Sequence, residues 1–315
     1  MINKVRNTVL SVINKNNYGY ISPSDFNLYA KQAQLDIFEG YFSDYNNQIN
    51  KENARLSGTG YADITKRIEE GIDIFSVTNG LVHSVSNKYE LPSQTTTGHD
   101  YYLLNKALVY QTLLDEGSTT SFVAGQNQLI DTAADFSIDI SVGDIIAIES
   151  GGVQYVTVIS IDSIDTLTTT GTLWVSAGIS YAIYKSTSKL EEAEKVSHSK
   201  ATILSNSMLT APSLTYPNYT HQGTLLTVYP NTITALGQIQ AQYIRYPKEP
   251  KWTYLTLPSG EPLFSASASD YQDFELPLDD ENTLVLKILQ YAGMSIREGE
   301  IYQFGNSEEI ENKQQ

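Results

Sequence analysis

The chain has 315 residues and a net charge of −16, from 20 Lys and Arg against 36 Asp and Glu, and it contains no cysteine. The lack of cysteine excludes disulfide bonds, thiol nucleophiles and cysteine-ligated metals, and an acidic surface repels phosphate, which disfavours a protein that clamps nucleic acid. Because no apolar run resembles a secretion signal or is long enough to span a membrane, the sequence predicts a soluble, intracellular protein.

Charge divides the chain into three predicted regions. Residues 1–118 have a net charge of −3, residues 119–188 have −6, and residues 189–315 have −7. The middle region contains a single cation, Lys185. This imbalance predicts that residues 119–188 form a module of separate origin, inserted into a core that the two ends of the chain build.

The first region is predicted to be helical. An apolar stripe over residues 2–13 repeats every three to four residues, which is typical of an amphipathic helix. The Ser-Pro-Ser-Asp sequence at 22–25 predicts a second helix start, because serine caps, proline fits the first helical position and the acid suits the positive helix end. The stripe of this helix continues to Ile49, and a third helix is predicted over 64–75.

The middle of the chain is predicted to be β-structure. The apolar segment 101–114 is interpreted as a strand, and residues 119–188 contain further short runs rich in Val, Ile, Thr and Tyr. These runs are 120–123, 145–148, 154–161, 166–168 and 181–184. Short strands at this spacing predict a small antiparallel sandwich or barrel.

The third region is predicted to form strands, then a helix. Residues 225–229 and 238–246 have the composition and alternation of strands. The acidic sequence 279–282 predicts a helix start, and the polar residues 307–315 predict a flexible tail. The predicted fold class is therefore α+β: a helical core from both chain ends, with antiparallel β elements and an inserted all-β domain.

The sequence contains no motif that assigns a reaction. It lacks the glycine-rich phosphate loop, the His-Glu-x-x-His zinc motif and the Gly-x-Ser-x-Gly elbow. Asp135, Asp139 and Asp144 lack the spacing of a calcium loop and are interpreted as acidic turns. We therefore predict no enzyme activity, no cofactor and no metal, with a carboxylate pair of a carbohydrate-active enzyme, brought together only by folding, as the enzymatic alternative.

A basic and aromatic segment occurs at residues 245–252, Arg-Tyr-Pro-Lys-Glu-Pro-Lys-Trp. Three interpretations are open: a rigid loop that docks a protein partner, a plain structural turn, or a surface that stacks single-stranded nucleic acid. Aromatic residues beside prolines and acids suit a docking loop. On that interpretation the predicted interaction residues are Trp252, Tyr254, Tyr271 and Phe274.

Four segments have a familiar sequence: residues 5–27, 30–34, 242–252 and 268–276. They resemble virion structural proteins of crAss-like tailed bacteriophages, in the group that forms head-to-tail connector rings. The resemblance covers the first and third regions, whereas the middle region is similar only to generic β modules. It implies a helix-bundle adaptor core that assembles as a homo-oligomeric ring, usually a dodecamer, in the virion neck, after synthesis in the host cytoplasm.

The resemblance also implies the partners. They are further copies of this chain, the portal protein and the neighbouring neck or tail ring proteins, with no membrane. Double-stranded DNA is expected to pass through the ring lumen without specific binding, because like charge suppresses contacts with phosphate. The competing interpretations are a tail accessory or receptor-binding protein and, less favoured, the carbohydrate-active enzyme.

Overall fold

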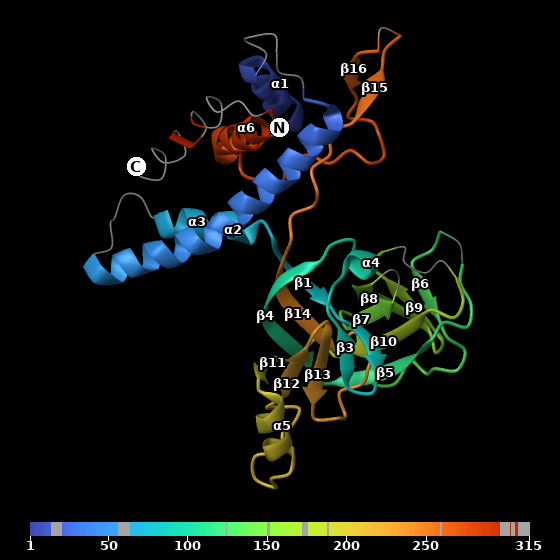
Figure 1. Cartoon of the computed structure of the whole chain (residues 1–315). Coiled ribbons are helices and arrows are strands. Elements are labelled where there is room, and N and C mark those ends of the chain that lie inside the picture. Colours follow the sequence, from blue (N-terminus) through green and yellow to red (C-terminus); the bar gives the residue numbers. More distant parts are fainter. Residues whose placement is uncertain are drawn as a thin grey trace. The chain divides into compact units, whose positions relative to one another are not determined.

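The computed structural model describes residues 1–13, 21–55, 64–123, 125–149, 152–171, 176–187, 189–258 and 260–296, with 303, 306 and 307. The chain forms two compact units (Figure 1). A helical unit consists of Met1–Phe75 and Pro247–Gln315, and a sheet unit consists of Ser76–Tyr246. The prediction of an α+β fold with a helical part built from both chain ends is confirmed.

The helices of the helical unit have the predicted bounds within a few residues. They are α1 (Ile2–Ile13), α2 (Pro23–Arg55), α3 (Ile64–Asp73), the short 3₁₀ turn η2 (Leu278–Asp280) and α6 (Glu281–Ile296). Helices α1 and α2 both pack on α6, and α3 packs on α2. The Oγ of Ser22 accepts the Asp25 N–H at 3.1 Å, which is the predicted cap at the start of α2.

The sheet unit contains one large, mixed and mostly antiparallel sheet. Along it the strands follow the order β2-β3-β13-β12-β11-β4-β14-β1-β8-β7-β10-β5, with β6 and β9 branching from β8. In sequence they are β1 (Ser76–Gly80), β2 (Val82–Val85), β3 (Lys88–Glu90), β4 (Tyr101–Tyr110), β5 (Leu113–Ser118), β6 (Gln128–Ile130), β7 (Ile145–Glu149), β8 (Val153–Ser163), β9 (Thr166–Thr169), β10 (Ser180–Tyr184), β11 (Leu190–Lys195), β12 (Asn218–Gln222), β13 (Leu225–Tyr229) and β14 (Ile239–Arg245). The pairing of β11 with β12 is parallel. No closed barrel is identified among the strands that the structure describes.

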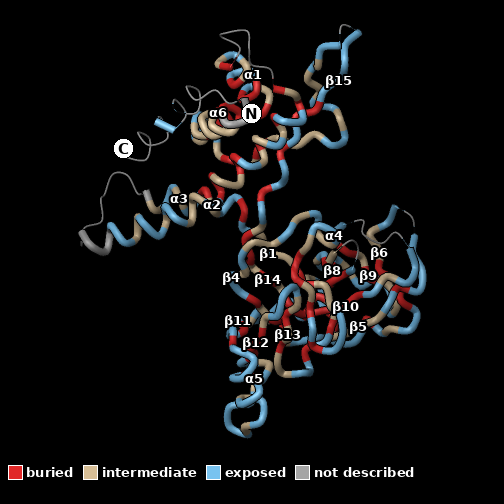
Figure 2. Tube along the Cα trace, viewed as in Figure 1, coloured by how far each residue is buried: buried red, intermediate tan, exposed pale blue. Residues whose placement is uncertain are grey.

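The predicted boundaries of the middle region, 118/119 and 188/189, lie inside the sheet unit, which extends from Ser76 to Tyr246. Residues 119–188 do contain a core of their own, centred on Leu129, Phe136 and Ile146. Their strands also continue the main sheet, because β10 pairs with β5 and β8 pairs with β1. Figure 2 accordingly shows buried segments throughout the sheet unit.

Three tyrosine hydroxyl groups donate to one short segment of the sheet unit, and two of them belong to the middle region. Residues 235–237 precede β14, and each of their three consecutive carbonyl groups accepts one tyrosine hydroxyl. Tyr89 donates to Ala235 at 3.0 Å, Tyr184 to Leu236 at 2.7 Å and Tyr155 to Gly237 at 2.8 Å. Burial raises the pKa of all three tyrosines, so they stay protonated donors. Many of the abundant tyrosines therefore stabilise this chain's own fold.

Several local predictions differ from the structure. The strand predicted at 120–123 is wrong, because only Ser121 forms an isolated bridge, to Ile130. The sequence did not predict the helices α4 (Gln94–Thr97) and α5 (His198–Ser205) or the strands β1, β2, β6, β11 and β12. Of the predicted tail at 307–315, only Ser307 lies within the described residues. Among the described helices, none has the length and apolar content to cross a bilayer.

Candidate interaction site

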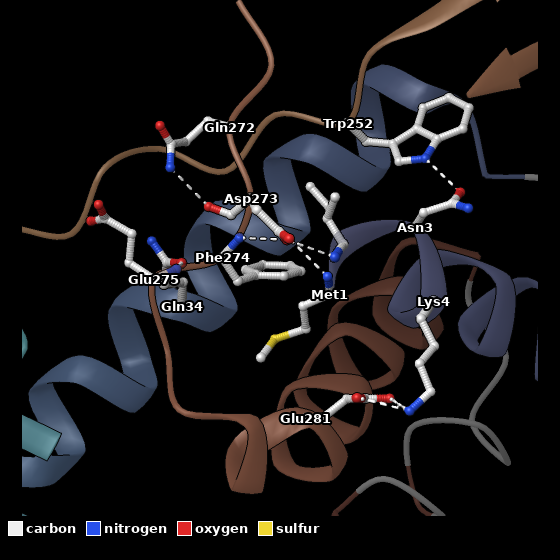
Figure 3. A network of polar contacts seen from close by, with 11 residues as sticks. Met1, Asn3, Lys4, Gln34, Trp252, Gln272, Asp273, Phe274, Glu275 and Glu281 are labelled. Carbon is white, nitrogen blue, oxygen red and sulfur yellow. Dashed lines mark hydrogen bonds and ion pairs between the residues drawn. The ribbon is translucent and has the colours of Figure 1, made fainter. Parts of the chain in front are cut away.

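The predicted interaction residue Trp252 lies in the interior of the helical unit, with 1% of its surface exposed. Its backbone N–H donates to Oδ1 of Asn27 on α2 at 2.8 Å, and its carbonyl accepts from the Asn27 Nδ2 at 3.2 Å. The indole N–H donates to Oδ1 of Asn3 on α1 at 3.1 Å (Figure 3). The Arg6 guanidinium lies 3.8 Å from the centre of the ring. Trp252 is therefore a fixed base that connects this segment to two helices.

A two-stranded β-hairpin begins two residues after Trp252. It consists of β15 (Tyr254–Thr256) and β16 (Pro262–Phe264), which pair with each other and with no other described strand. Tyr254 faces Phe264 across the hairpin. Both rings stack on Trp252, with centroids at 5.6 Å and 5.9 Å, and Tyr271 meets Phe264 edge to face at 5.8 Å. One face of the hairpin is thereby attached to the helical unit by aromatic packing.

The opposite face of the hairpin is apolar and open to solvent. Leu255 and Leu263 are cross-strand partners, and they are 63% and 52% exposed. Leu257, which follows on the same side of the strand, is 39% exposed. Glu261 is the sole charged residue in the sequence 252–264. Exposed apolar side chains gathered on a short hairpin with two open edges mark a surface that a protein partner can cover.

A polar network holds the strand-like segment after the hairpin against the helices (Figure 3). The carboxylate of Asp273 accepts the Met1 ammonium and the Ile2 N–H, both at 2.7 Å, and the Phe274 N–H at 2.8 Å. Burial raises the pKa of Asp273, but these three hydrogen bonds together outweigh it and hold the pKa below its ordinary value. On α2, the Gln34 side chain accepts the Glu275 N–H at 3.1 Å and donates to the Lys248 carbonyl at 2.8 Å.

The four predicted interaction residues consequently have different environments. Trp252 and Phe274 are buried within their own unit, with 1% and 8% of their surfaces exposed, so in this chain they act as core residues. This differs from the expectation that both contact neighbouring molecules. Tyr254 is 46% exposed and Tyr271 is half-buried, and both belong to the aromatic group around Phe264.

Two charged residues of the segment 245–252 form ion pairs within the helical unit. Lys251 forms an ion pair with Asp270 at 2.6 Å, and the hydrogen bond from Lys251 lowers the pKa of that carboxyl. Glu249, in the same segment, forms an ion pair with Lys31 of α2. One cation of the segment is thus balanced by a carboxylate, and the Arg245 guanidinium donates to the Tyr246 carbonyl at 3.2 Å, which does not favour the interpretation of a nucleic-acid stacking surface.

Two of the three aspartates in the acidic turns, Asp135 and Asp144, accept hydrogen bonds from nearby backbone N–H groups. Asp144 is buried, and its two carboxylate oxygens accept the Ser141 and Ser186 N–H groups at 2.8 Å and 2.9 Å. Asp135 accepts both the N–H and the hydroxyl of Ser137. Within the described residues, no group of three or more His, Cys, Asp or Glu has an arrangement suited to a metal ion.

Sequence reasoning missed the apolar tip of the hairpin and the ring on which it stacks. The missed residues are Leu255, Leu257, Leu263 and Phe264. The sequence did contain a usable signal: over residues 254–257, tyrosine and threonine alternate with two leucines, just before Pro258. The chain matches none of the protein-family models and none of the curated proteins with which it was compared.

Proposed function

We propose that this protein is a virion structural protein that forms a ring in the portal–tail connector of a tailed bacteriophage. In this proposal the ring docks other neck and tail proteins and gives double-stranded DNA a passage that does not bind it specifically. The observation that supports it best is the hairpin β15–β16, whose base stacks on buried Trp252 and whose leucine face lacks a covering element within the described residues. A fixed element with an open apolar face is suited to contacts between subunits.

Other features are consistent with the same role. The helical unit is interpreted as the adaptor core, and the β-structure of residues 119–188 as an inserted sandwich or barrel that modifies it. A net charge of −16 per copy makes a ring strongly acidic, so that copies repel unless apolar contacts hold them. The same charge lets DNA slide past the ring without releasing counterions.

Imaging tests the proposal directly. We expect negative-stain images of the purified protein, or of virions that contain it, to show closed rings. The double variant Leu255→Asp/Leu263→Asp should lose rings while its unfolding free energy stays within about 0.5 kcal/mol of wild type, because both side chains are exposed. Leu278→Asp, at a leucine that is 77% exposed elsewhere in the helical unit, is the matched control and should keep rings.

The same preparations give a second readout. Because apolar contacts are expected to hold the ring, its assembly should be insensitive to salt or strengthened by it. Assembly that weakens steeply as salt rises would contradict the proposed interface. A particle reconstruction that places the polypeptide outside every closed ring would refute the proposed function.

A further inference from the structure

Helix α5 lies in the connection between the parallel strands β11 and β12 of the sheet unit. We term α5 and the residues that follow it, 198–209, the α5 strap. Figure 1 shows the strap leaving the sheet unit beside these two strands, and Figure 2 shows most of it exposed. Met208 and Leu209 at its end are fully exposed, at 102% and 96%.

The helix of the strap packs on the face of β12 that points away from the apolar core. Tyr219 of β12 belongs to that core, so its neighbours Asn218 and Thr220 point to the opposite face. Glu194 of β11 is paired with Asn218 and shares its face. Because the Glu194 carboxylate forms an ion pair with Lys200 of α5 at 3.0 Å, α5 lies over this face.

The surface beneath α5 is polar, and its hydrogen bonds are incomplete. Asn218 and Thr220 are buried, with 6% and 1% of their surfaces exposed. Neither Oδ1 of Asn218 nor Oγ1 of Thr220 has a hydrogen-bond partner among the described residues. A buried polar group without a partner costs free energy, which is recovered when water reaches the group. Both atoms therefore favour a state in which α5 has lifted from β12.

Few contacts of α5 oppose such an opening. The structure describes all eight residues of this helix, and Ala201 is the one that is buried. Lys200 and Glu194 are 52% and 70% exposed, and ion pairs this exposed contribute little to stability. A helix of this length is also marginal in water without tertiary packing. One buried methyl group thus has to offset two buried polar atoms that lack partners.

The chain on either side of the strap is held by contacts that do not involve α5. Before it, the Val196 N–H donates to the Tyr219 carbonyl at 2.9 Å and continues the pairing of β11 with β12. After it, Leu214 packs against the apolar core, and its carbonyl accepts the Gln111 side chain at 3.3 Å. The strap can therefore open without breaking any strand pairing.

We propose that the α5 strap is a conformational device that releases from β12 by local opening while the strands of the sheet unit stay paired. Local openings of this kind occur where few apolar contacts hold an element. Once released, the strap moves Met208 and Leu209 away from the sheet between fixed points at Val196 and Leu214. The proposal concerns the single chain and does not depend on the proposed ring function.

Native-state hydrogen exchange of the full-length protein measures the opening. The amides of Ala201 and Asn206 donate to carbonyl groups at 197 and 202, and the Val228 amide of β13 donates to Asn87. We expect both α5 amides to exchange at least about 100-fold faster than the Val228 amide. Low urea should leave the α5 rates unchanged and raise the strand rate, because only global unfolding exposes much surface. One common rate for all three amides would overturn the proposal.

A pair of matched variants tests the physical cause. Thr220→Val removes the unpartnered hydroxyl with little change of shape and should slow exchange of the α5 amides about tenfold. Thr227→Val is the control, because Thr227 is the cross-strand partner of Thr220 on the same face and is half-buried; it should change these rates less than about twofold. Equal effects of the two variants would overturn the proposal, since the Thr220 hydroxyl would then be hydrogen-bonded beneath α5.

A third variant tests whether α5 opens separately from the strands. Ala201→Gly removes the buried methyl group and weakens the helix, so it should speed exchange of the Asn206 amide about tenfold. The Val228 amide should keep its wild-type rate. An equal acceleration of both amides would overturn the proposal, because α5 and β13 would then unfold as one cooperative unit.

Discussion

Gly237 is the position at which one added methyl group should loosen the junction between the middle region and the rest of the sheet unit. Its φ angle is +64°, in the left-handed region that favours glycine. A Cβ atom there would lie 2.5 Å from the Ala147 Cβ on β7 and 2.9 Å from a methyl carbon of Val153 on β8. Its carbonyl also accepts the Tyr155 hydroxyl at 2.8 Å.

The expected cost of Gly237→Ala has two parts. The left-handed conformation costs an alanine about 1–2 kcal/mol relative to glycine, and forcing a methyl group into a filled core costs about 1–3 kcal/mol more. We therefore expect the sheet unit to lose about 2–5 kcal/mol of unfolding free energy. Gly223→Ala is the matched control, because its φ is +61° but nothing lies within 4 Å of the added carbon; it should lose only the first part.

Urea denaturation, followed by hydrogen exchange of the amides in β7, β8 and β14, measures both variants in the same unit. Gly237→Ala should lower protection in all three strands more than Gly223→Ala does. Equal losses in the two variants would show that the close approach of residues 235–237 to β7 and β8 does not contribute to stability. The middle region would then behave as the separate module that its composition predicts.

Three further outcomes are expected. Trp252→Ala should destabilise the helical unit by about 3–5 kcal/mol in urea unfolding, because it empties a buried site. Leu255→Ala, at an exposed side chain, should change the unfolding free energy by less than about 0.5 kcal/mol. Equal losses of unfolding free energy in the two variants would show that Trp252 is not a core residue. The pKa of Asp273 is lowered in the folded state, so its stabilisation is complete above the ordinary aspartate pKa and is lost as pH falls through the lowered value; urea midpoints of Asp273→Asn should therefore vary less with pH in acid than those of wild type. Burial raises the pKa of Tyr243 to about 12, so the sheet unit should lose stability as pH rises from about 10 to about 12. We expect the absorbance of the Tyr243 phenolate to appear together with unfolding. A Tyr243 phenolate that is fully formed near pH 10 in the folded protein would contradict this prediction.

Local patterns were enough to predict most elements of the helical unit. The cap at Ser22, the stripe on α2 and the apolar positions of α6 all depend on residues within a few turns of one another. Leu284, Ile288 and Ala292 follow the predicted acidic helix start at helical spacing, and each is fully buried on α6. Strand β14 was predictable for the same reason, because the alternation that marks a half-buried strand lies entirely within its own sequence. Its alternating residues Ile239, Ala241 and Tyr243 are buried.

The limits of the sheet unit were not predictable in the same way. A scarcity of cations over 119–188 describes the surface of that segment and contains no information on which strands pair. The pairing of β10 with β5 and the acceptance of Tyr184 and Tyr155 hydroxyls by residues 236 and 237 join positions that are 52 to 82 residues apart. Such contacts depend on the closed fold, so composition alone does not show that residues 119–188 pack into a larger unit that extends from Ser76 to Tyr246.

The interaction site shows the same limit at single residues. The sequence correctly indicated that aromatic residues gather around 252–274, but which aromatic faces the chain's own helices depends on partners 225 and 249 positions away, Asn27 and Asn3. Trp252 therefore supports the hairpin from the interior of the helical unit. The exposed side chains of the site are Leu255 and Leu263, on the opposite face of the hairpin. In a short hairpin the two faces alternate residue by residue, so an inward Trp252 and Tyr254 require an outward Leu255. In this hairpin, the large aromatic residue beside prolines marks the base. The aliphatic residues that follow it mark the exposed contact surface.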